Sequence, residues 1–233
     1  MLRGLKEEYN RVMAHVTRLP LFPLNTVLFP GQLLPLHIFE PRYRLMISEC
    51  LAGGLSFGVV LIRAGHAAGE EVTPYDVGTT ARIEQVDRLN DGRMNILCVG
   101  EARFKLTALR HDRPFLNGDA DLWPWEPLPT AQAASRATQI KNLLTTYIKR
   151  LAQATGNQVQ LDEMPAEAAP LANLAAIVLQ IPNREKQELL SASTIDHLLD
   201  ACIRVLHREN RALKIAAALP LAPHDDTIPF SRN

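Results

Sequence analysis

From Leu19 to Arg44 the chain reads LPLFPLNTVLFPGQLLPLHIFEPRYR, which is its most unusual stretch. Five prolines stand among large apolar residues in this stretch. Proline has no backbone N–H for a sheet ladder, so strands built here must lie at a sheet edge or bend at each proline. Pro30-Gly31 predicts a turn. Pro41 suits the first turn of a helix, which we expect to run to Leu51 and to end at Gly53-Gly54.

The chain around this stretch, up to Leu122, has short apolar runs broken by proline and glycine, a pattern typical of strands and turns. Asn90-Asp91-Gly92 lies between two such runs, and Asp-Gly favours a type I′ turn, so we expect an antiparallel hairpin over Thr80–Cys98. The expected strands are Arg18–Leu21, Gln32–Ile38, Phe57–Ile62, Thr80–Val86, Arg93–Cys98, Arg103–Leu109 and Asn117–Leu122.

The pattern becomes helical after Thr130. Apolar residues recur at i, i+3, i+4 and i+7 over Ile140–Leu151, Leu171–Leu179 and Ile195–Leu206, which predicts three amphipathic helices. Asn183 is the expected cap of a further helix over Glu185–Ser191. The fold class is therefore α+β, with a β-rich part at residues 17–127 and a helical part at 128–216. Residues 1–16 are expected to be an extension and residues 217–233 a tail.

Composition restricts the function. Lys and Arg number 25, and Asp and Glu also number 25, so the chain has no net charge that would attract nucleic acid or an anionic membrane. Three widely spaced cysteines show neither a disulfide framework nor metal-ligand spacing, as in a reducing cytoplasm. No apolar run approaches the length of a membrane span. We therefore expect a cytoplasmic protein.

Motifs that carry chemistry are missing from the sequence. No His-Glu-x-x-His, Gly-x-Ser-x-Gly or phosphate-binding glycine loop occurs, and the seven histidines have no zinc-finger spacing. We expect no metal, no cofactor and no catalytic residues, while an active site assembled from distant residues stays open as an alternative.

Three segments, in the same order along the chain, resemble the N-terminal domain of Lon proteases, which cereblon also carries. They are the opening stretch from Leu19, the segment Val77–Leu106, and the helical end LANLAAIVLQIPNREKQELLSASTIDHLLDACIRVL. The resemblance implies a PUA-like β pseudo-barrel with one inserted helix, followed by a helical bundle. It also implies a non-catalytic module that recognises protein substrates, without the ATPase and peptidase of Lon, and that could act as an adaptor.

Such a module would bind unfolded or flexible segments, or a protease or chaperone partner, at a proline-interrupted sheet edge. Leu36, Ile38 and Phe39 are expected in the core, because they alternate with the proposed strand. The candidate peptide-binding residues are Phe22, Leu28, Phe29, Pro30, Leu34 and Tyr43, with Arg42 or Arg44 to orient a carboxyl group.

Trp123 and Trp125 flank Pro124 at the junction of the two parts. They either seal the interface or form an aromatic wall in a cleft between the parts. Two alternatives to peptide binding remain. One is RNA binding, by analogy with other PUA-like barrels, along Arg103, Lys105, Arg110, His111 and Arg113. The other is a small-molecule binder or enzyme that uses the cleft.

Overall fold

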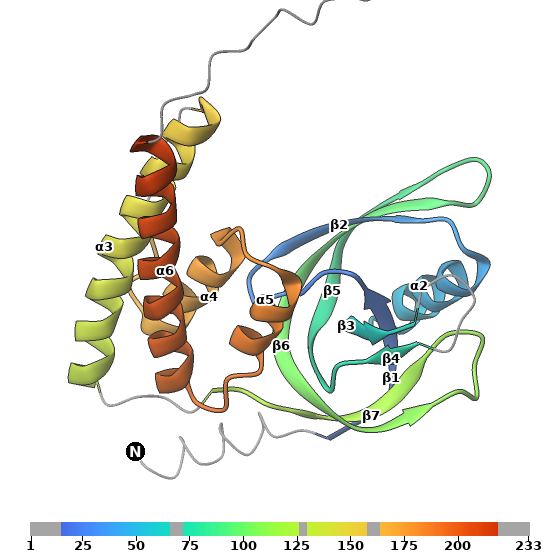
Figure 1. The fold of residues 1–233 in the computed structure, drawn as a ribbon. Coiled ribbons are helices and arrows are strands. Elements are labelled where there is room, and N and C mark those ends of the chain that lie inside the picture. The colour runs from blue at the N-terminus through green and yellow to red at the C-terminus, as the bar shows by residue number, and fades with distance from the viewer. Residues whose placement is uncertain (1–14, 66–71, 126–129, 158–163, 219–233) are drawn as a thin grey trace, which may run out of the picture.

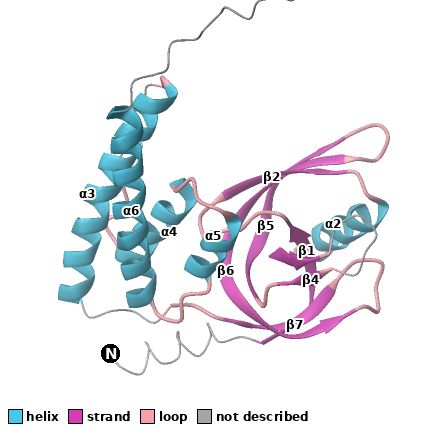
Figure 2. Ribbon diagram, viewed as in Figure 1, coloured by secondary structure: helices cyan, strands magenta, loops and turns pink. Residues whose placement is uncertain are grey.

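The computed structural model describes residues 15–65, 72–125, 130–157 and 164–218. Figures 1 and 2 show the strands and one helix gathered on one side of the molecule and the remaining helices on the other. The predicted extension and tail lie largely outside the described residues, as does the boundary predicted after residue 127. The strands are β1 His15–Leu24, β2 Leu33–Ile38, β3 Phe57–Ala64, β4 Thr73–Pro74, β5 Val77–Arg88, β6 Met94–Arg110 and β7 Asn117–Leu122.

Five strands close into a barrel. Antiparallel pairs join β1 to β7, β7 to β6, β6 to β5 and β5 to β3, and a parallel pairing of β3 with β1 completes the circle. β6 is one strand of 17 residues where two separate strands were expected. Its first half pairs with β5 and β2, and its second half with β5 and β7. One long strand therefore connects β2 to the barrel.

The hairpin of β5 and β6 is confirmed, but its predicted turn type is wrong. The Leu89 N–H donates to the Arg93 carbonyl at 2.8 Å, and the Gly92 N–H donates to the Leu89 carbonyl at 2.9 Å. Gly92 has a φ of 80°, whereas Asp91 does not have a positive φ, which a type I′ turn requires. The connection is a three-residue loop in which a type I turn precedes a left-handed glycine.

β1 does not lie at an edge, although it contains Pro20 and Pro23. It pairs with β7 on one side and β3 on the other, and a bulge between Val16 and Leu19 interrupts the ladder. Arg18 in this bulge has a φ of 55°, and its N–H donates to Asp119 Oδ1 at 3.0 Å. Strands with proline were expected either to bend or to lie at a sheet edge. β1 bends at its bulge, and β2 lies at an edge.

The helices form two groups. α2 (Pro41–Gly53) closes the end of the barrel away from the other helices (Figure 1) and buries Tyr43, Met46, Ile47 and Cys50. It ends at Gly54, whose φ of 60° is the left-handed cap expected there. The other helices are α3 Thr130–Thr155, α4 Ala168–Val178, α5 Asn183–Leu190 and α6 Ile195–Ala218.

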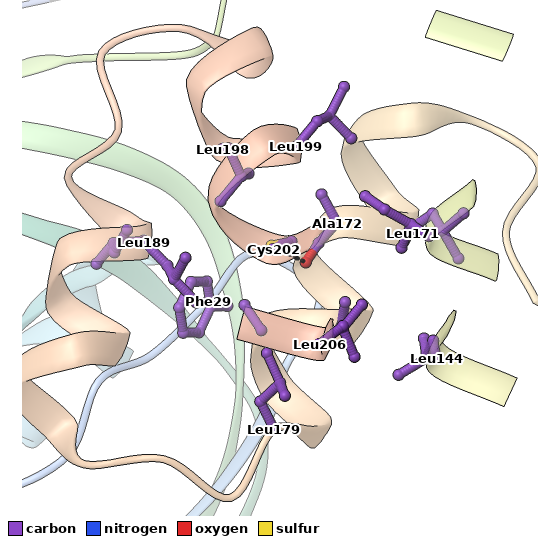
Figure 3. Close-up of a cluster of buried hydrophobic side chains, with 14 of the residues drawn as sticks. Phe29, Leu144, Leu171, Ala172, Leu179, Leu189, Leu198, Leu199, Cys202 and Leu206 are labelled. Atoms are coloured by element: carbon purple, nitrogen blue, oxygen red, sulfur yellow. Dashed lines mark hydrogen bonds between the residues drawn. The ribbon is translucent and has the colours of Figure 1, made fainter. Parts of the chain in front are cut away.

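One hydrophobic cluster joins the helices α3–α6 to the barrel, while two others lie within the β-rich part. Leu171, Leu198, Leu199 and Leu206 pack together from α4 and α6, and Phe29, from the loop after β1, enters the same cluster (Figure 3). The predicted cap Asn183 is instead the first helical residue of α5, and its Nδ2 donates to the Asn25 carbonyl at 2.7 Å. The loop 25–31 therefore fastens the barrel to the helices.

Candidate functional site

β2 has one open edge. In the described part of the chain it pairs only with β6. The Gly100 N–H donates to the Gln32 carbonyl at 2.9 Å, and hydrogen-bonded pairs alternate in an antiparallel ladder. Leu34, Leu36 and Ile38 therefore bond to β6, while the backbone of the residues between them faces outward.

Pro35 is one of the residues whose backbone faces outward, so the N–H that proline lacks is not needed for the ladder with β6. Two N–H groups, those of Leu33 and His37, and three carbonyls, those of Leu33, Pro35 and His37, are directed to the open edge. These are the groups with which a further extended segment would pair.

The outer face of β2 is apolar and exposed. Leu33 is 60% exposed and Phe39 58%. His37 stacks on Phe39 with ring centroids 6.0 Å apart, and its Nδ1 lies 2.7 Å from Asn95 Oδ1. Opposite residues of paired strands share a face, so Val99 and Leu97, the partners of Leu33 and Pro35, extend the surface across β6. We call Leu33, Pro35, His37, Phe39, Leu97 and Val99 the β2 edge.

Four predicted peptide-binding side chains lie in the core. Phe22 packs on Tyr43 with ring centroids 4.1 Å apart, and both are buried with Leu28 in the cluster that α2 closes. Phe29 is fully buried against the helices. Burial also raises the pKa of Tyr43. The structure therefore does not place these four side chains on a binding surface. β1 and the loop after it turn Phe22, Leu28 and Phe29 inward, and α2 turns Tyr43 inward.

The other predicted peptide-binding residues lie apart from one another. Leu34 is half-buried on the inner face of β2, and Pro30 lines a cavity between barrel and helices. Arg42 pairs with Glu40 at 2.8 Å and lies over the Tyr43 ring. Arg44 lies against Gly92 of the β5–β6 loop.

The exposed residues of the β2 edge were not predicted from the sequence, and the prediction that Phe39 lies in the core is wrong, because its side chain is 58% exposed. Phe39 follows the strand in phase with Leu33 and His37, not with the buried Ile38. A signal was present, because a polar His37 in phase with Pro35 indicates the outer face. The leucines on both faces of β2 masked it.

The cavity between barrel and helices has a volume of about 310 Å³ and mainly apolar walls, among them Trp125 and Pro170. The two candidate tryptophans meet at Arg103, whose guanidinium carbon lies 4.4 Å from the Trp123 ring centroid and 3.6 Å from that of Trp125. The Trp125 Nε1–H donates to the Ala192 carbonyl at 3.0 Å. Trp125 thus combines both expected roles, since it holds the interface and also lines the cavity, whereas Trp123 packs on Arg103 outside the cavity wall.

The basic residues proposed for RNA do not form an open track. Arg103, expected on an exposed strand, is 2% exposed because it turns into the interface of the two parts. Arg110 pairs with Asp119, and Arg113 pairs with Glu49. Lys105 is exposed, 5.8 Å from the Trp123 ring. The arginines of this set that reach the surface are therefore balanced by carboxylates.

The described residues lack two further kinds of feature. They contain no group of three or more His, Cys, Asp or Glu side chains that could hold a metal ion. None of their helices is both long and apolar enough to cross a membrane.

The sequence is similar to that of Lon proteases. The chain is 26% identical over 205 residues to a Lon protease of Anaeromyxobacter dehalogenans and 25% identical to Lon protease 2 of Myxococcus xanthus, covering 85% of this chain in each case. The match takes in 24% of each protease, so the chain spans about a quarter of their length.

Two solved structures have a similar fold. The crystal structure of a Lon N-terminal domain protein from Xanthomonas campestris is 26% identical, with a TM-score of 0.56, and the match covers 88% of this chain and 100% of that one. The N-terminal domain of a Mycobacterium avium complex Lon protease matches with a TM-score of 0.60 at 19% identity, covering 81% of this chain and 97% of that one. The likeness supports the mixed α and β fold; the PUA-like and bundle assignments stay predictions.

The family model of the substrate-binding domain of ATP-dependent protease La (LON) matches residues 18–208, which is most of the chain and includes both the β2 edge and the cavity. The chain belongs to this family of substrate-binding domains.

Proposed function

We propose that this chain binds extended or unfolded protein segments at the β2 edge, without chemistry of its own, and passes them to a protease or chaperone partner as an adaptor. Membership in a family of substrate-binding domains supports protein recognition. The observation that carries the proposal is the open edge of β2, with Leu33 and Phe39 both more than half exposed beside it.

The β2 edge supplies the two components that recognition of an unfolded segment needs. Outward-facing N–H and C=O groups pair with any extended backbone, whatever its sequence. The apolar face formed with Val99 and Leu97 then favours segments that carry exposed apolar side chains, which are abundant in unfolded chains and scarce on folded ones. An extended client with apolar side chains at alternate positions fits best, because alternate residues of a strand share a face.

The test uses a fluorescently labelled, reduced and alkylated polypeptide that stays unfolded, with binding followed by anisotropy. The variant Leu33→Asp/Phe39→Asp places two charges on the β2 edge. We expect its affinity to fall at least tenfold, about 1.4 kcal/mol, because burying the new carboxylates beside a client is unfavourable.

The matched control is Leu55→Asp/Leu109→Asp, which adds the same charge at leucines that are 60% and 40% exposed. We expect it to bind like the wild-type chain. Wild-type affinity of the β2-edge variant, or an equal loss in both variants, would overturn the proposal.

A further inference from the structure

The wall of the interface cavity contains a buried cation without an acidic partner. Arg103 lines the cavity and is 2% exposed. Its NH1 donates to the carbonyls of Leu190 at 2.6 Å and Ala192 at 2.9 Å. Its Nε and NH2 have no hydrogen-bond partner, and no acidic side chain among the described residues pairs with it. Burial lowers the pKa of Arg103 to about 9, so the guanidinium is still charged at neutral pH.

A residue with an unpaired hydrogen-bond acceptor lines the same cavity. Asn173 of α4 is 8% exposed, and its Oδ1 is buried without a hydrogen-bond partner. Leaving a buried donor or acceptor unpaired costs about 1–3 kcal/mol, so such groups usually have a partner. Two residues of the cavity wall thus carry unmet polar atoms, N–H donors on Arg103 and an acceptor on Asn173, which are themselves buried.

The rest of the wall determines what else the ligand carries. Pro30, Leu122, Trp125 and Pro170 are apolar, and a cavity of about 310 Å³ is at the small end of ligand sites. A ligand that pairs with Arg103 and Asn173 and also contacts the apolar wall therefore has a carboxylate, an N–H donor close to it and one apolar side chain. The last residue of a polypeptide has all three.

We infer that the cavity binds the C-terminal residue of a protein or peptide, with its carboxylate on Arg103, its amide N–H on Asn173 and its side chain against Trp125. This inference rests on the proposed function and adds a preference for chain ends. The two orphaned nitrogens of Arg103 are covered in the free protein, so the ligand must displace part of their cover. Trp125 stacks on the guanidinium and also lines the cavity, so its surroundings change on binding.

Glu101 also lines the cavity and bears on the charge of the ligand. Its Oε1 accepts from Arg82 Nε at 2.7 Å and its Oε2 from Ser56 Oγ at 2.9 Å, so its carboxylate is engaged away from Arg103. A negative charge at the cavity wall repels a doubly charged anion more strongly than a single carboxylate. This disfavours phosphate as the natural ligand.

The two tryptophans of the chain both contact Arg103, so intrinsic fluorescence reports this site without a label. The probes are acetyl-Ala-Ala-Leu with a free carboxylate and the same peptide as its C-terminal amide, with acetate and inorganic phosphate as further ligands. We expect saturable changes in emission with the free acid and at least tenfold weaker binding of the amide. Equal binding of acid and amide, or tighter binding of acetate or phosphate than of the acid, would overturn the inference.

Variants test the roles of the two polar residues. Arg103→Lys keeps the charge but loses the planar fork of donors, so we expect its preference for acid over amide to fall below that of the wild-type chain. Asn173→Asp keeps the shape of the side chain and adds a charge that repels the carboxylate, so it should lose the same preference if Arg103→Lys does not fold. Lys105→Met is the control, since Lys105 is a cation on the same strand outside the cavity wall, and it should bind like the wild-type chain.

The result is separable from that of the proposed function. Suppose the wild-type chain binds acid and amide equally and still binds unfolded polypeptide through Leu33 and Phe39. This result refutes only the proposed site for C-terminal residues, which we call the chain-end site. Tight binding of the free acid by a chain that does not bind unfolded polypeptide refutes the β2-edge proposal and retains the chain-end site.

Discussion

Two halves of the same proline-rich stretch end in opposite surroundings. From Leu19 to Phe29 nearly every large apolar side chain is buried, whereas Leu33 and Phe39, a few residues later, are more than half exposed. The composition of the two halves is similar. They differ in pairing, since β1 has a partner strand on each side and β2 has one on a single side.

The difference shows that apolar residues alone do not predict a binding surface. Phe29 packs in the helical core because the loop after β1 crosses from the barrel to the helices. Phe39 is exposed because no element of the described chain covers the outer face of β2. Binding is therefore expected where the sheet lacks a neighbour.

The largest expected difference in stability comes from replacing a phenylalanine by alanine in each half of the proline-rich stretch. Phe29→Ala should lower the free energy of unfolding by about 3–5 kcal/mol, because it leaves a cavity between barrel and helices. Phe39→Ala should change it by less than about 0.5 kcal/mol and should weaken client binding instead. Denaturation with urea measures both. Equal destabilisation by the two variants would break the comparison.

A smaller loss of stability is expected at Gly100, where β6 packs against the loop that carries Phe29. A Cβ on Gly100 would lie 2.3 Å from the Phe29 carbonyl oxygen, so Gly100→Ala must displace the backbone of this loop. We expect a loss of about 1–3 kcal/mol, as for other overpacked sites. Gly53→Ala in α2 is the control. Its nearest neighbour is the flexible side chain of Leu55, so the urea midpoint should not fall.

The smallest effect concerns the bulge that lets β1 pair on both sides. Hydrogen bonds from Arg110 and from the Arg18 N–H lower the pKa of Asp119 from 3.8 to about 2. Because the pKa is depressed on folding, the stabilisation is present above about pH 4 and is lost as pH falls towards 2. The urea midpoint of Asp119→Asn should lie below that of the wild-type chain at pH 5 and meet it near pH 2. A gap that persists at low pH would contradict this role for the carboxylate.

The sequence predicted the element types well and the exposure of individual side chains poorly. Helical stripes such as Ile195–Leu206 are long enough for their period to be unambiguous, and α6 confirms that one. The apolar run predicted a strand over Gln32–Ile38, and its proline predicted an edge or a bend; β2 is an edge strand. The inward turn of Phe22 and Tyr43 depends on α2 closing the barrel end, which is a contact between elements that local pattern does not encode.

The site at Arg103 shows the same limit. Arg103 and Lys105 share a face of β6, as strand alternation requires, and both lie against the Trp123 ring. The helical part docked on that face buries Arg103, whose NH1 reaches the Leu190 carbonyl, whereas Lys105 stays exposed. The sequence did mark Trp123 and Trp125 as a possible cleft wall. It could not show that both rings stack on one arginine whose remaining donors have no partner.

Amide hydrogen exchange, resolved residue by residue by NMR, tests the open edge of β2 most directly. In the free chain the Leu33 and His37 amides should exchange quickly, while those of Leu34 and Leu36 are protected by β6. Addition of the unfolded polypeptide should slow exchange at Leu33 and His37 specifically. If polypeptide binds and these two amides keep exchanging at the rate of the free chain, the client does not pair with β2.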